Sequence, residues 1–326
     1  MDNPYVFITR KIPNEILTEL KELAEVSMWE YDDKPVSRER LLEEAQKATA
    51  LLTMLSDPVD KALMDHAPKL KVIANLAVGY DNIDIEAATN AEIVICNTPD
   101  VLTDTTADLA FGLLMATARK ITEAERFIRD GKWVNWSPFL LAGYDIHHKT
   151  IGIVGMGRIG ETVARRATGF EMNIQYYNRS RKKTAEESLG ASYVSFDDLL
   201  RTSDFVVNLT PLTAETKGLF NYEAFQKMKK DAIFINVGRG GSVVEKDLVA
   251  ALENKEIVAA GLDVFTEEPI SASDPLLSHP NTVCLPHIGS SSIETRMEMC
   301  RLAVRNIVKV VKGEEPETPV NKRAFR

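Results

Sequence analysis

The sequence predicts an α/β protein built from two doubly wound parallel sheets. Short apolar runs alternate with segments of helical periodicity along the 326 residues, which is typical of parallel sheets flanked by helices. The strand-like runs fall into two series, and a glycine-rich turn stands after the first strand of the second series. A chain of this length, 44% hydrophobic, is expected to fold as about two domains with cores of ordinary size.

The first series of strands occupies the N-terminal third of the chain. Helical patterns separate its apolar runs, which lie at residues 5–8, 50–54, 72–74 and 93–96. A long helix is predicted at 103–129, because Leu109 and Leu113 recur at helical spacing and Gly131 follows as a stop. A helix of that length is expected to connect two domains or two subunits.

The second series of strands occupies the rest of the chain. Its apolar runs are residues 151–154, 174–177, 205–208, 232–236, 259–263 and 282–285. Six strands of this kind make a full dinucleotide-binding set. A closing helix is predicted over 293–312, because Gly313 and then Pro316 follow it.

A glycine-rich turn joins the first strand of this second series to the helix after it. The turn reads Gly155, Met156, Gly157, Arg158, Ile159 and Gly160. Such a pattern alone is weak evidence for a dinucleotide site. Its position between a strand and a helix favours a dinucleotide site over the alternative, a glycine-rich turn that arose by chance. Gly155 would permit the tight turn and Gly157 the approach of a pyrophosphate to the backbone, which would lie at the helix N-terminus. Gly160 would let the helix pack closely on the strand.

The residues after the next strand bear on which dinucleotide binds. An NAD site normally has Asp or Glu there to bind the ribose 2′-OH. This chain has no acid there but Asn178, Arg179 and Ser180, followed by three further cations. An Arg and a hydroxyl would bind a 2′-phosphate that a carboxylate would repel, so the sequence favours NADP(H) over NAD(H). The alternative is a solvated basic loop without a ligand.

Composition argues against several other classes of protein. The formal net charge of −9 makes nucleic acid an unexpected partner. No apolar run approaches the roughly eighteen residues of a membrane span, so no membrane contact is expected. Three scattered cysteines are too few for a metal site or a disulfide framework, and no metal is expected. The first residues lack the features of a secretory signal, so we expect a cytoplasmic protein.

Three polar residues follow the last three strands of the second series. These residues are Arg239, Glu268 and His287. Ligands of doubly wound folds bind at the carboxyl ends of strands, so the three side chains are expected to converge on the crevice that holds the dinucleotide. A lone histidine is more often structural than catalytic, but its occurrence with an arginine and a glutamate in matching places favours catalysis.

With these motifs the chain resembles the D-isomer-specific 2-hydroxyacid dehydrogenases. The resemblance runs from the turn at 79–84 to the final helix and is strongest to NADPH-dependent glyoxylate and hydroxypyruvate reductases, including those that also reduce 2-ketogluconate. It implies a flavodoxin-like substrate-binding domain, residues 1–99 and 288–326. A Rossmann dinucleotide-binding domain, residues 100–287, is inserted into it.

The resemblance also implies roles for the site residues in reducing a small 2-keto acid. Arg239 would hold the substrate carboxylate and polarise the 2-keto oxygen. His287 would protonate that oxygen as hydride arrives from the nicotinamide, while Glu268 would hold the histidine ring and favour the imidazolium. The backbone N–H groups of Val78 and Gly79 would bind the carboxylate as a small anion nest.

Further contacts with the cofactor are implied in the same way. Beyond the glycine-rich turn and the 178–180 loop, the residues implied to line the cofactor are Thr106, Arg158, Ile159, Thr210, Pro211, Val237, Gly238, Asp263 and Gly289. Members of the family dimerise through the region that corresponds to residues 103–144. A homodimer is therefore expected.

Two positions bear on the substrate. Hydroxypyruvate reductases end a Trp-x-Pro-x-Trp stretch, which reaches a neighbouring subunit's site, with a tryptophan where this chain has Leu140. The smaller side chain would leave room for a polyol tail, so 2-ketogluconate is an alternative substrate. Phosphite-oxidising relatives have lysine where this chain has Val78, which argues against that reaction. Corepressor-type relatives sense dinucleotide redox state, but Arg239, Glu268 and His287 together favour an enzyme.

Overall fold

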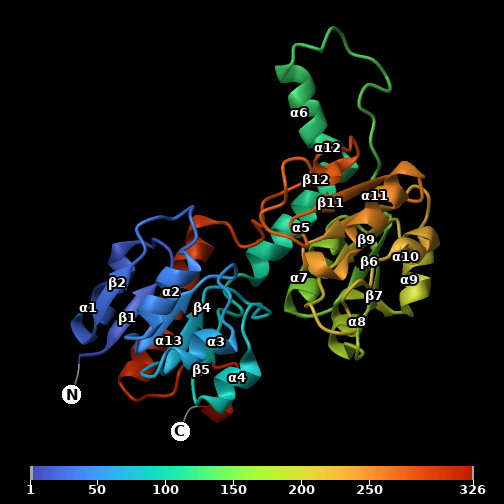
Figure 1. The fold of residues 1–326 in the computed structure, drawn as a ribbon. Coiled ribbons are helices and arrows are strands. Elements are labelled where there is room, and N and C mark those ends of the chain that lie inside the picture. The colour runs from blue at the N-terminus through green and yellow to red at the C-terminus, as the bar shows by residue number, and fades with distance from the viewer. Residues whose placement is uncertain (1–2, 325–326) are drawn as a thin grey trace. The chain divides into compact units, whose positions relative to one another are not determined.

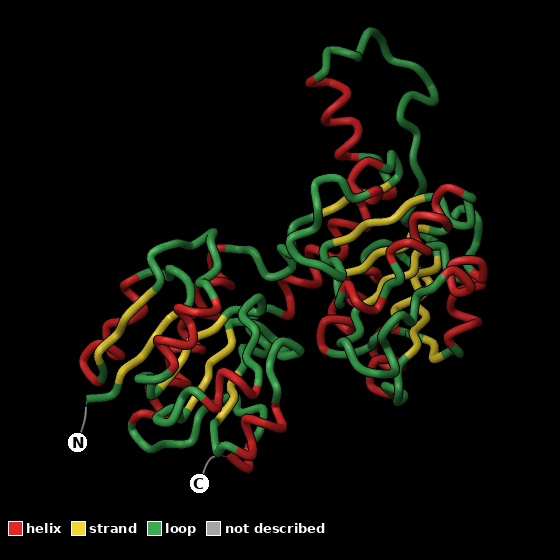
Figure 2. Tube along the Cα trace, in the orientation of Figure 1, coloured by secondary structure: helices red, strands yellow, loops and turns green. Residues whose placement is uncertain are grey.

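The computed structural model describes residues 3–324, which form two compact α/β units (Figures 1 and 2). The first unit contains the described residues up to Leu102 and those from Ser292 onward, and the second is Thr103–Ser291. No helix of the described residues has the length and apolar character that crossing a membrane requires.

The sheet of the first unit is parallel, and its strands follow the order β2-β1-β3-β4-β5. The strands are β1 (Tyr5–Ile8), β2 (Glu25–Met28), β3 (Ala50–Thr53), β4 (Val72–Asn75) and β5 (Val94–Cys96). This is the flavodoxin-like order that the resemblance implies. Strand β2 was not expected, because it lies at the sheet edge and its residues are exposed or half-buried, which leaves no apolar run in the sequence.

Helices cover both faces of this sheet. On one face, inward-facing strand residues pack against α2 (Arg38–Ala45), α3 (Lys61–Asp65) and α4 (Ile85–Asn90). On the other, α13 (Ile293–Val311) packs on β3 and β4, and α1 (Thr18–Leu23) packs on α13. Short 3-10 turns at η1 (Asn14–Leu17) and η3 (Lys322–Ala324) complete the unit. The carboxyl ends of its strands are left for loops.

The sheet of the second unit is also parallel and follows the order β12-β11-β10-β9-β6-β7-β8. The strands are β6 (Thr150–Val154), β7 (Asn173–Tyr177), β8 (Ser192–Tyr193), β9 (Phe205–Asn208), β10 (Ile233–Asn236), β11 (Ala259–Leu262) and β12 (Thr282–Cys284). Numbered within the unit, this order contains the 3-2-1-4-5-6 arrangement of dinucleotide-binding folds. All six expected strands are present, and the two-residue β8 is too short to give a sequence signal.

Two apolar layers cover this second sheet. One is formed by α5 (Thr103–Ala118), α7 (Arg158–Thr168) and α8 (Lys183–Leu189). The other is formed by α9 (Phe196–Thr202), α10 (Tyr222–Lys227), α11 (Glu245–Glu253) and α12 (Pro275–Ser278), with the 3-10 turn η2 (Gly240–Ser242) beside them. Both faces are buried, which explains why the strands read as continuous apolar runs.

The helix expected over 103–129 is two helices, and the prediction of one continuous helix was wrong. Helix α5 ends at Ala118, Lys120 has a left-handed φ of 53°, and α6 (Ile121–Arg129) begins after it. The chain returns at Tyr144, whose N–H binds the Ala118 carbonyl at 2.9 Å. This distant segment ends the first helix, so local periodicity could not reveal the break. Helix α6 and the loop after it stand out from the sheet of the second unit (Figure 1).

Candidate active site

The glycine-rich turn of the second unit has the geometry of a phosphate-binding turn. Gly155 has φ of 99°, which L side chains rarely adopt, and a Cβ at Gly160 would lie 2.3 Å from the Gly155 carbonyl oxygen. Around Gly157, by contrast, no atom other than those of its chain neighbours lies within 4 Å of where a Cβ would be, so space remains beside the backbone at the start of α7. Gly157 is also the N-cap of α7 and makes no side-chain cap, which leaves helix N–H groups for an anion. The turn therefore fits a dinucleotide pyrophosphate.

Glu268 and His287 form a hydrogen-bonded pair. The Glu268 Oε2 lies 2.7 Å from the His287 Nδ1, and the two side chains are 28% and 26% exposed. The second carboxylate oxygen accepts the Phe265 N–H at 2.9 Å, which fixes the carboxylate itself. An ionised carboxylate only accepts hydrogen bonds, so Nδ1 is the donor here and Nε2 is the nitrogen left for proton exchange with a ligand.

The charge state of Glu268 suits this pairing. Burial raises the pKa of the Glu268 carboxyl, but the hydrogen bond and charge of His287, the Phe265 N–H and the charge of Arg239 together outweigh burial. The net result is a pKa below the ordinary value, so the carboxylate stays ionised near neutral pH. A fixed negative charge therefore lies beside the imidazole ring of His287.

The backbone beneath His287 is held in an unusual conformation. His287 has φ of 53°, in the left-handed region that only a well-supported residue retains. The support comes from Asp263, whose two carboxylate oxygens accept the N–H groups of Ile288 and Gly289, each at 2.8 Å. Burial raises the pKa of Asp263, although the charge of His287 and the two N–H groups oppose it. Asp263 thus orients the histidine through the chain that follows it.

Thr106, Asp263 and Gly289 lie together in the second unit. A Cβ at Gly289 would lie 3.3 Å from both the Asp263 Oδ2 and the Thr106 Cγ2. Any side chain at this position would therefore crowd both residues. Their grouping beside His287 is compatible with a flat ring bound there.

The loop that carries Arg239 packs directly against the loop that carries Glu268. A Cβ at Gly240 would lie 1.8 Å from the Phe265 carbonyl carbon, so only glycine permits this approach. The side chain of Arg239 donates to the Gly238 carbonyl at 2.9 Å, and its charge contributes to the lowered pKa of Glu268. The structure therefore brings Arg239, Glu268 and His287 to one edge of the second sheet, as the sequence predicts.

Buried asparagines at two strand ends hold these loops, and sequence reasoning missed them. Asn208 ends β9 and donates to the Asn236 Oδ1 at 2.9 Å and to the Ser242 Oγ at 2.7 Å. Asn236 ends β10 and accepts the Gly238 N–H at 3.1 Å. A polar residue that closes an otherwise apolar strand was the available signal.

The loops expected near the adenosine are joined by the same asparagines. The Thr210 hydroxyl and N–H both bind the Asn208 Oδ1, at 2.8 and 3.2 Å. A Cβ at Gly238 would lie 2.7 Å from the Thr210 carbonyl oxygen, so the two loops touch. Pro211 is exposed and Val237 is buried beside them.

In the basic loop after β7, some side chains are paired with carboxylates and others are exposed without such a pair among the described residues. Arg181 pairs with Glu186 at 2.6 Å, and Lys182 lies 3.6 Å from Glu161. Arg179 and Ser180 are exposed, and the charge of Arg179 contributes, after the Thr213 hydroxyl, to lowering the pKa of Glu215. No hydrogen bond or ion pair holds the Arg179 side chain to another described residue. Arg179 and Ser180 are thus the groups of this loop that a 2′-phosphate could contact.

Val78 and Gly79 lie in the first unit, just after β4. Their backbone N–H groups, like that of Tyr80, donate to no acceptor within residues 3–324. All three residues are half-buried or exposed, so water or an anion can reach them. The turn is chemically suited to a small carboxylate.

Comparison with known proteins finds relatives along the full length of this chain. The model of the D-isomer specific 2-hydroxyacid dehydrogenase NAD-binding domain matches residues 111–289. A glyoxylate reductase of Pyrococcus horikoshii is 49% identical over 327 residues, which cover 99% of this chain and 97% of the relative. One of Thermococcus kodakarensis is 50% identical over 327 residues, which cover 99% and 98%.

Solved structures that are similar to this chain include reductases of the same kind. An NADPH-dependent glyoxylate/hydroxypyruvate reductase of Sinorhizobium meliloti, in complex with NADP and malonate, has a TM-score of 0.87 and 35% identity. The match covers 100% of this chain and 99% of that one. A glyoxylate reductase of Paecilomyes thermophila has a TM-score of 0.88 and 33% identity, with coverage of 99% and 100%.

Proposed function

We propose that this chain, which belongs to the D-isomer-specific 2-hydroxyacid dehydrogenase family, reduces glyoxylate or hydroxypyruvate to the 2-hydroxy acid with NADPH. The observation that carries the proposal is the 2.7 Å contact between Glu268 and His287. This contact orients a proton donor, and reduction of a keto group needs a proton donor for the carbonyl oxygen. The relatives named glyoxylate reductase match this chain along its full length.

Each side chain has a distinct task in this reaction. The Nε2 of His287 delivers a proton to the keto oxygen, and Glu268 stabilises the charged ring before delivery. Arg239 holds the substrate carboxylate and polarises the carbonyl through its planar guanidinium. Bound NADPH supplies the hydride. In the reverse direction the same groups act with His287 as base.

The first unit contributes the anion-binding turn in this proposal. The unpartnered N–H groups of Val78 and Gly79 bind the substrate carboxylate through hydrogen bonds to a charged acceptor. The malonate in the Sinorhizobium meliloti complex is a carboxylate ligand of a relative with the same fold.

Preference for NADP(H) over NAD(H) is proposed from the loop after β7. The loop has no acid in the place of the ribose-binding carboxylate, and Arg179 and Ser180 are exposed there. The relative from Sinorhizobium meliloti is NADPH-dependent and was solved with NADP. Binding of the pyrophosphate by Gly155, Gly157 and Gly160 is common to both cofactors.

A homodimer and a cytoplasmic location are also proposed. Apolar side chains between α6 and β6 are strongly exposed, including Trp136 at 74% and Phe139 at 86%, which is typical of a surface that another chain covers. The three cysteines are free thiols, as expected in a reducing compartment.

Reduction of 2-ketogluconate is the second candidate activity. It rests on Leu140, which stands where a tryptophan would narrow the site in hydroxypyruvate reductases. A corepressor-like sensor is the alternative of another class, and it would bind the dinucleotide without turning over a keto acid.

Initial rates of NADPH and NADH oxidation at 340 nm test these alternatives. The substrates are glyoxylate, hydroxypyruvate, pyruvate and 2-ketogluconate, compared by kcat/KM. The proposal expects NADPH with glyoxylate or hydroxypyruvate to be fastest. Faster turnover of 2-ketogluconate would establish the second activity instead, and cofactor binding without turnover of any keto acid would favour the sensor.

A further inference from the structure

Two asparagine side chains hold the carbonyl groups of the anion-binding turn in the first unit. Asn97, just after β5, donates from Nδ2 to the Val78 carbonyl at 2.8 Å. Asn75, the last residue of β4, donates from Nδ2 to the Gly79 carbonyl at 3.1 Å. Asn75 is fully buried, so its carboxamide has little freedom to move. Both donors come from strand ends next to the turn, not from the turn itself.

Holding a carbonyl fixes the N–H of the same peptide group. In a trans peptide the C=O and N–H point in opposite directions within one rigid plane. The bond from Asn97 to the Val78 carbonyl therefore sets the direction of the Gly79 N–H. In the same way, the bond from Asn75 to the Gly79 carbonyl sets the direction of the Tyr80 N–H.

The peptide before these two is fixed by backbone alone. The Thr98 N–H donates to the Ala77 carbonyl at 2.8 Å, which sets the Val78 N–H. Three successive peptide groups thus have bound carbonyls, while their three N–H groups find no acceptor in the described chain. A run of oriented, unpartnered donors is what an anion site requires, and orienting it before the ligand arrives lowers the cost of binding.

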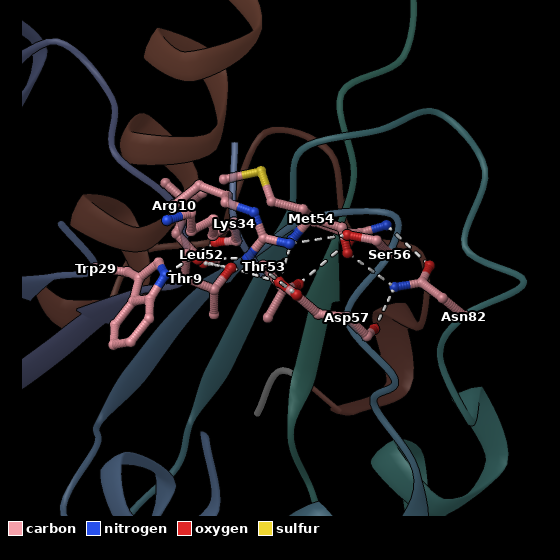
Figure 3. Close-up of polar contacts among 11 residues, drawn as sticks. Thr9, Arg10, Trp29, Lys34, Leu52, Thr53, Met54, Ser56, Asp57 and Asn82 are labelled. Atoms are coloured by element: carbon pink, nitrogen blue, oxygen red, sulfur yellow. Dashed lines mark hydrogen bonds and ion pairs between the residues drawn. The ribbon is translucent and has the colours of Figure 1, made fainter. Parts of the chain in front are cut away.

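The same hydrogen-bond network continues into a second turn. Asn75 Nδ2 also donates to the Asn82 Oδ1 at 3.2 Å, and Asn82 donates to the carbonyls of Met54 and Asp57 at 3.2 and 2.9 Å. Figure 3 shows Asn82 beside Met54, Ser56 and Asp57 at the end of β3. Asp57 in turn accepts the Met54 N–H at 2.8 Å and the Thr9 hydroxyl. Two turns at one edge of the sheet are therefore held as a unit.

We propose that Asn97 and Asn75 are positioning residues that aim the N–H groups of this turn at the substrate carboxylate. The inference rests on the proposed function, because it assigns these residues to the binding of the keto acid. It differs from a structural role in one measurable respect. Loss of aim weakens binding of the carboxylate, whereas loss of structure alone lowers stability.

The test replaces Asn97 with Asp, a residue of nearly equal size that cannot donate when ionised. A carboxylate there repels the Val78 carbonyl and turns the peptide. The expected result is a rise in KM for glyoxylate of about tenfold, with kcat within about threefold and unchanged affinity for NADPH. The affinity of the enzyme–NADPH complex for oxalate, a dicarboxylate that is not reduced, should fall by a similar factor in calorimetry.

Asn321→Asp is the matched control in the same unit. Asn321 is a carboxamide like Asn97, although more deeply buried, and it binds the Ile93 carbonyl and the Ile95 N–H, away from the turn. This variant should lower the melting temperature and leave KM and oxalate affinity unchanged. Asn97→Ala, which removes the donor without adding charge, decides the case if Asn97→Asp does not fold.

The outcomes separate the inference from the proposed function. Wild-type oxalate and glyoxylate values in the folded Asn97 variants overturn the inference, as does an equal rise of KM in Asn321→Asp. A wild-type enzyme that binds oxalate but reduces no keto acid contradicts the proposed function. In that case a loss of oxalate affinity in the Asn97 variants still supports the positioning role.

Discussion

At the scale of the residue, His287 combines a charged partner with a conformation that chains rarely adopt. A left-handed backbone at a non-glycine residue costs on the order of 1 kcal/mol or more, so the surroundings must enforce it. Asp263 does so through the two N–H groups that follow, and Glu268 holds the ring itself. The side chain is therefore oriented before a substrate binds.

Replacement of His287 by Ala should separate chemistry from assembly. The variant loses the proton donor but keeps the glycine-rich turn, so kcat should fall by about 10²- to 10⁴-fold. Affinity for NADPH, measured by fluorescence titration, should stay within about threefold of the wild type. A variant that does not fold would show that the role of His287 is structural.

The lowered pKa of Glu268 leads to a prediction about pH. Ionised Glu268 stabilises the folded protein at pH values above the ordinary pKa of a glutamate, and this stabilisation is lost as the pH falls through the lower pKa of the folded state. The carboxylate is therefore charged throughout the neutral range. Glu268→Gln removes this charge. In the direction of reduction, kcat/KM should fall about tenfold or more at neutral pH, and the loss of activity that protonation of Glu268 causes at acid pH in the wild type should be absent from the variant. A pH profile that is parallel to the wild type would contradict this role.

At the scale of the element, parallel strands place polar residues at one edge of each sheet. Three strands, β4, β9 and β10, end in the buried asparagines Asn75, Asn208 and Asn236. Each carboxamide binds groups of neighbouring loops, because it both donates and accepts. The loops that follow these strands are consequently fixed where ligands of such folds bind.

The loop after β7 is the element that should distinguish the two cofactors. Arg179→Asp places a carboxylate where a 2′-phosphate is expected, so KM for NADPH should rise by about 100-fold, while KM for NADH changes only a few-fold. Arg181→Gln is the control on the same loop, because Arg181 is already paired with Glu186, and it should leave the ratio of the two KM values unchanged. Equal effects of Arg179→Asp on both cofactors would mean that another segment recognises the phosphate.

At the scale of the whole molecule, the segment from α6 to β6 is the part of the second unit with the most exposed apolar surface. Val134 is 95% exposed and Phe139 is 86% exposed, although both are large apolar residues. Exposure of this kind is costly in water and is relieved when a second chain covers it. The proposed homodimer provides that cover.

Substitution of Phe139 by Asp should therefore shift the protein from dimer toward monomer. A charge in an apolar interface is left without a partner, which costs several kcal/mol in similar sites. Light scattering after size-exclusion chromatography measures the change. Ile293→Asp is the control, since Ile293 is 81% exposed on α13 of the first unit and should leave the dimer intact. A wild-type monomer, or no effect of Phe139→Asp, would contradict the proposal.

The sequence by itself determined the fold class, the glycine-rich turn and the three polar residues after the last strands. These are local features, because a buried parallel strand must be apolar and a phosphate-binding turn must contain glycine. The edge strand β2 and the two-residue β8 escaped prediction because neither forms an apolar run.

Only the tertiary structure decided how distant segments meet. The break after Ala118 depends on the contact with Tyr144. The orientation of His287 depends on Glu268 and Asp263. The direction of the Gly79 N–H depends on the hydrogen bond from Asn97. Each of these is a hydrogen bond between groups far apart in sequence. Such a bond forms only where the sheet brings two strand ends or loops together. The periodicity and the turn residues along the chain therefore do not predict it.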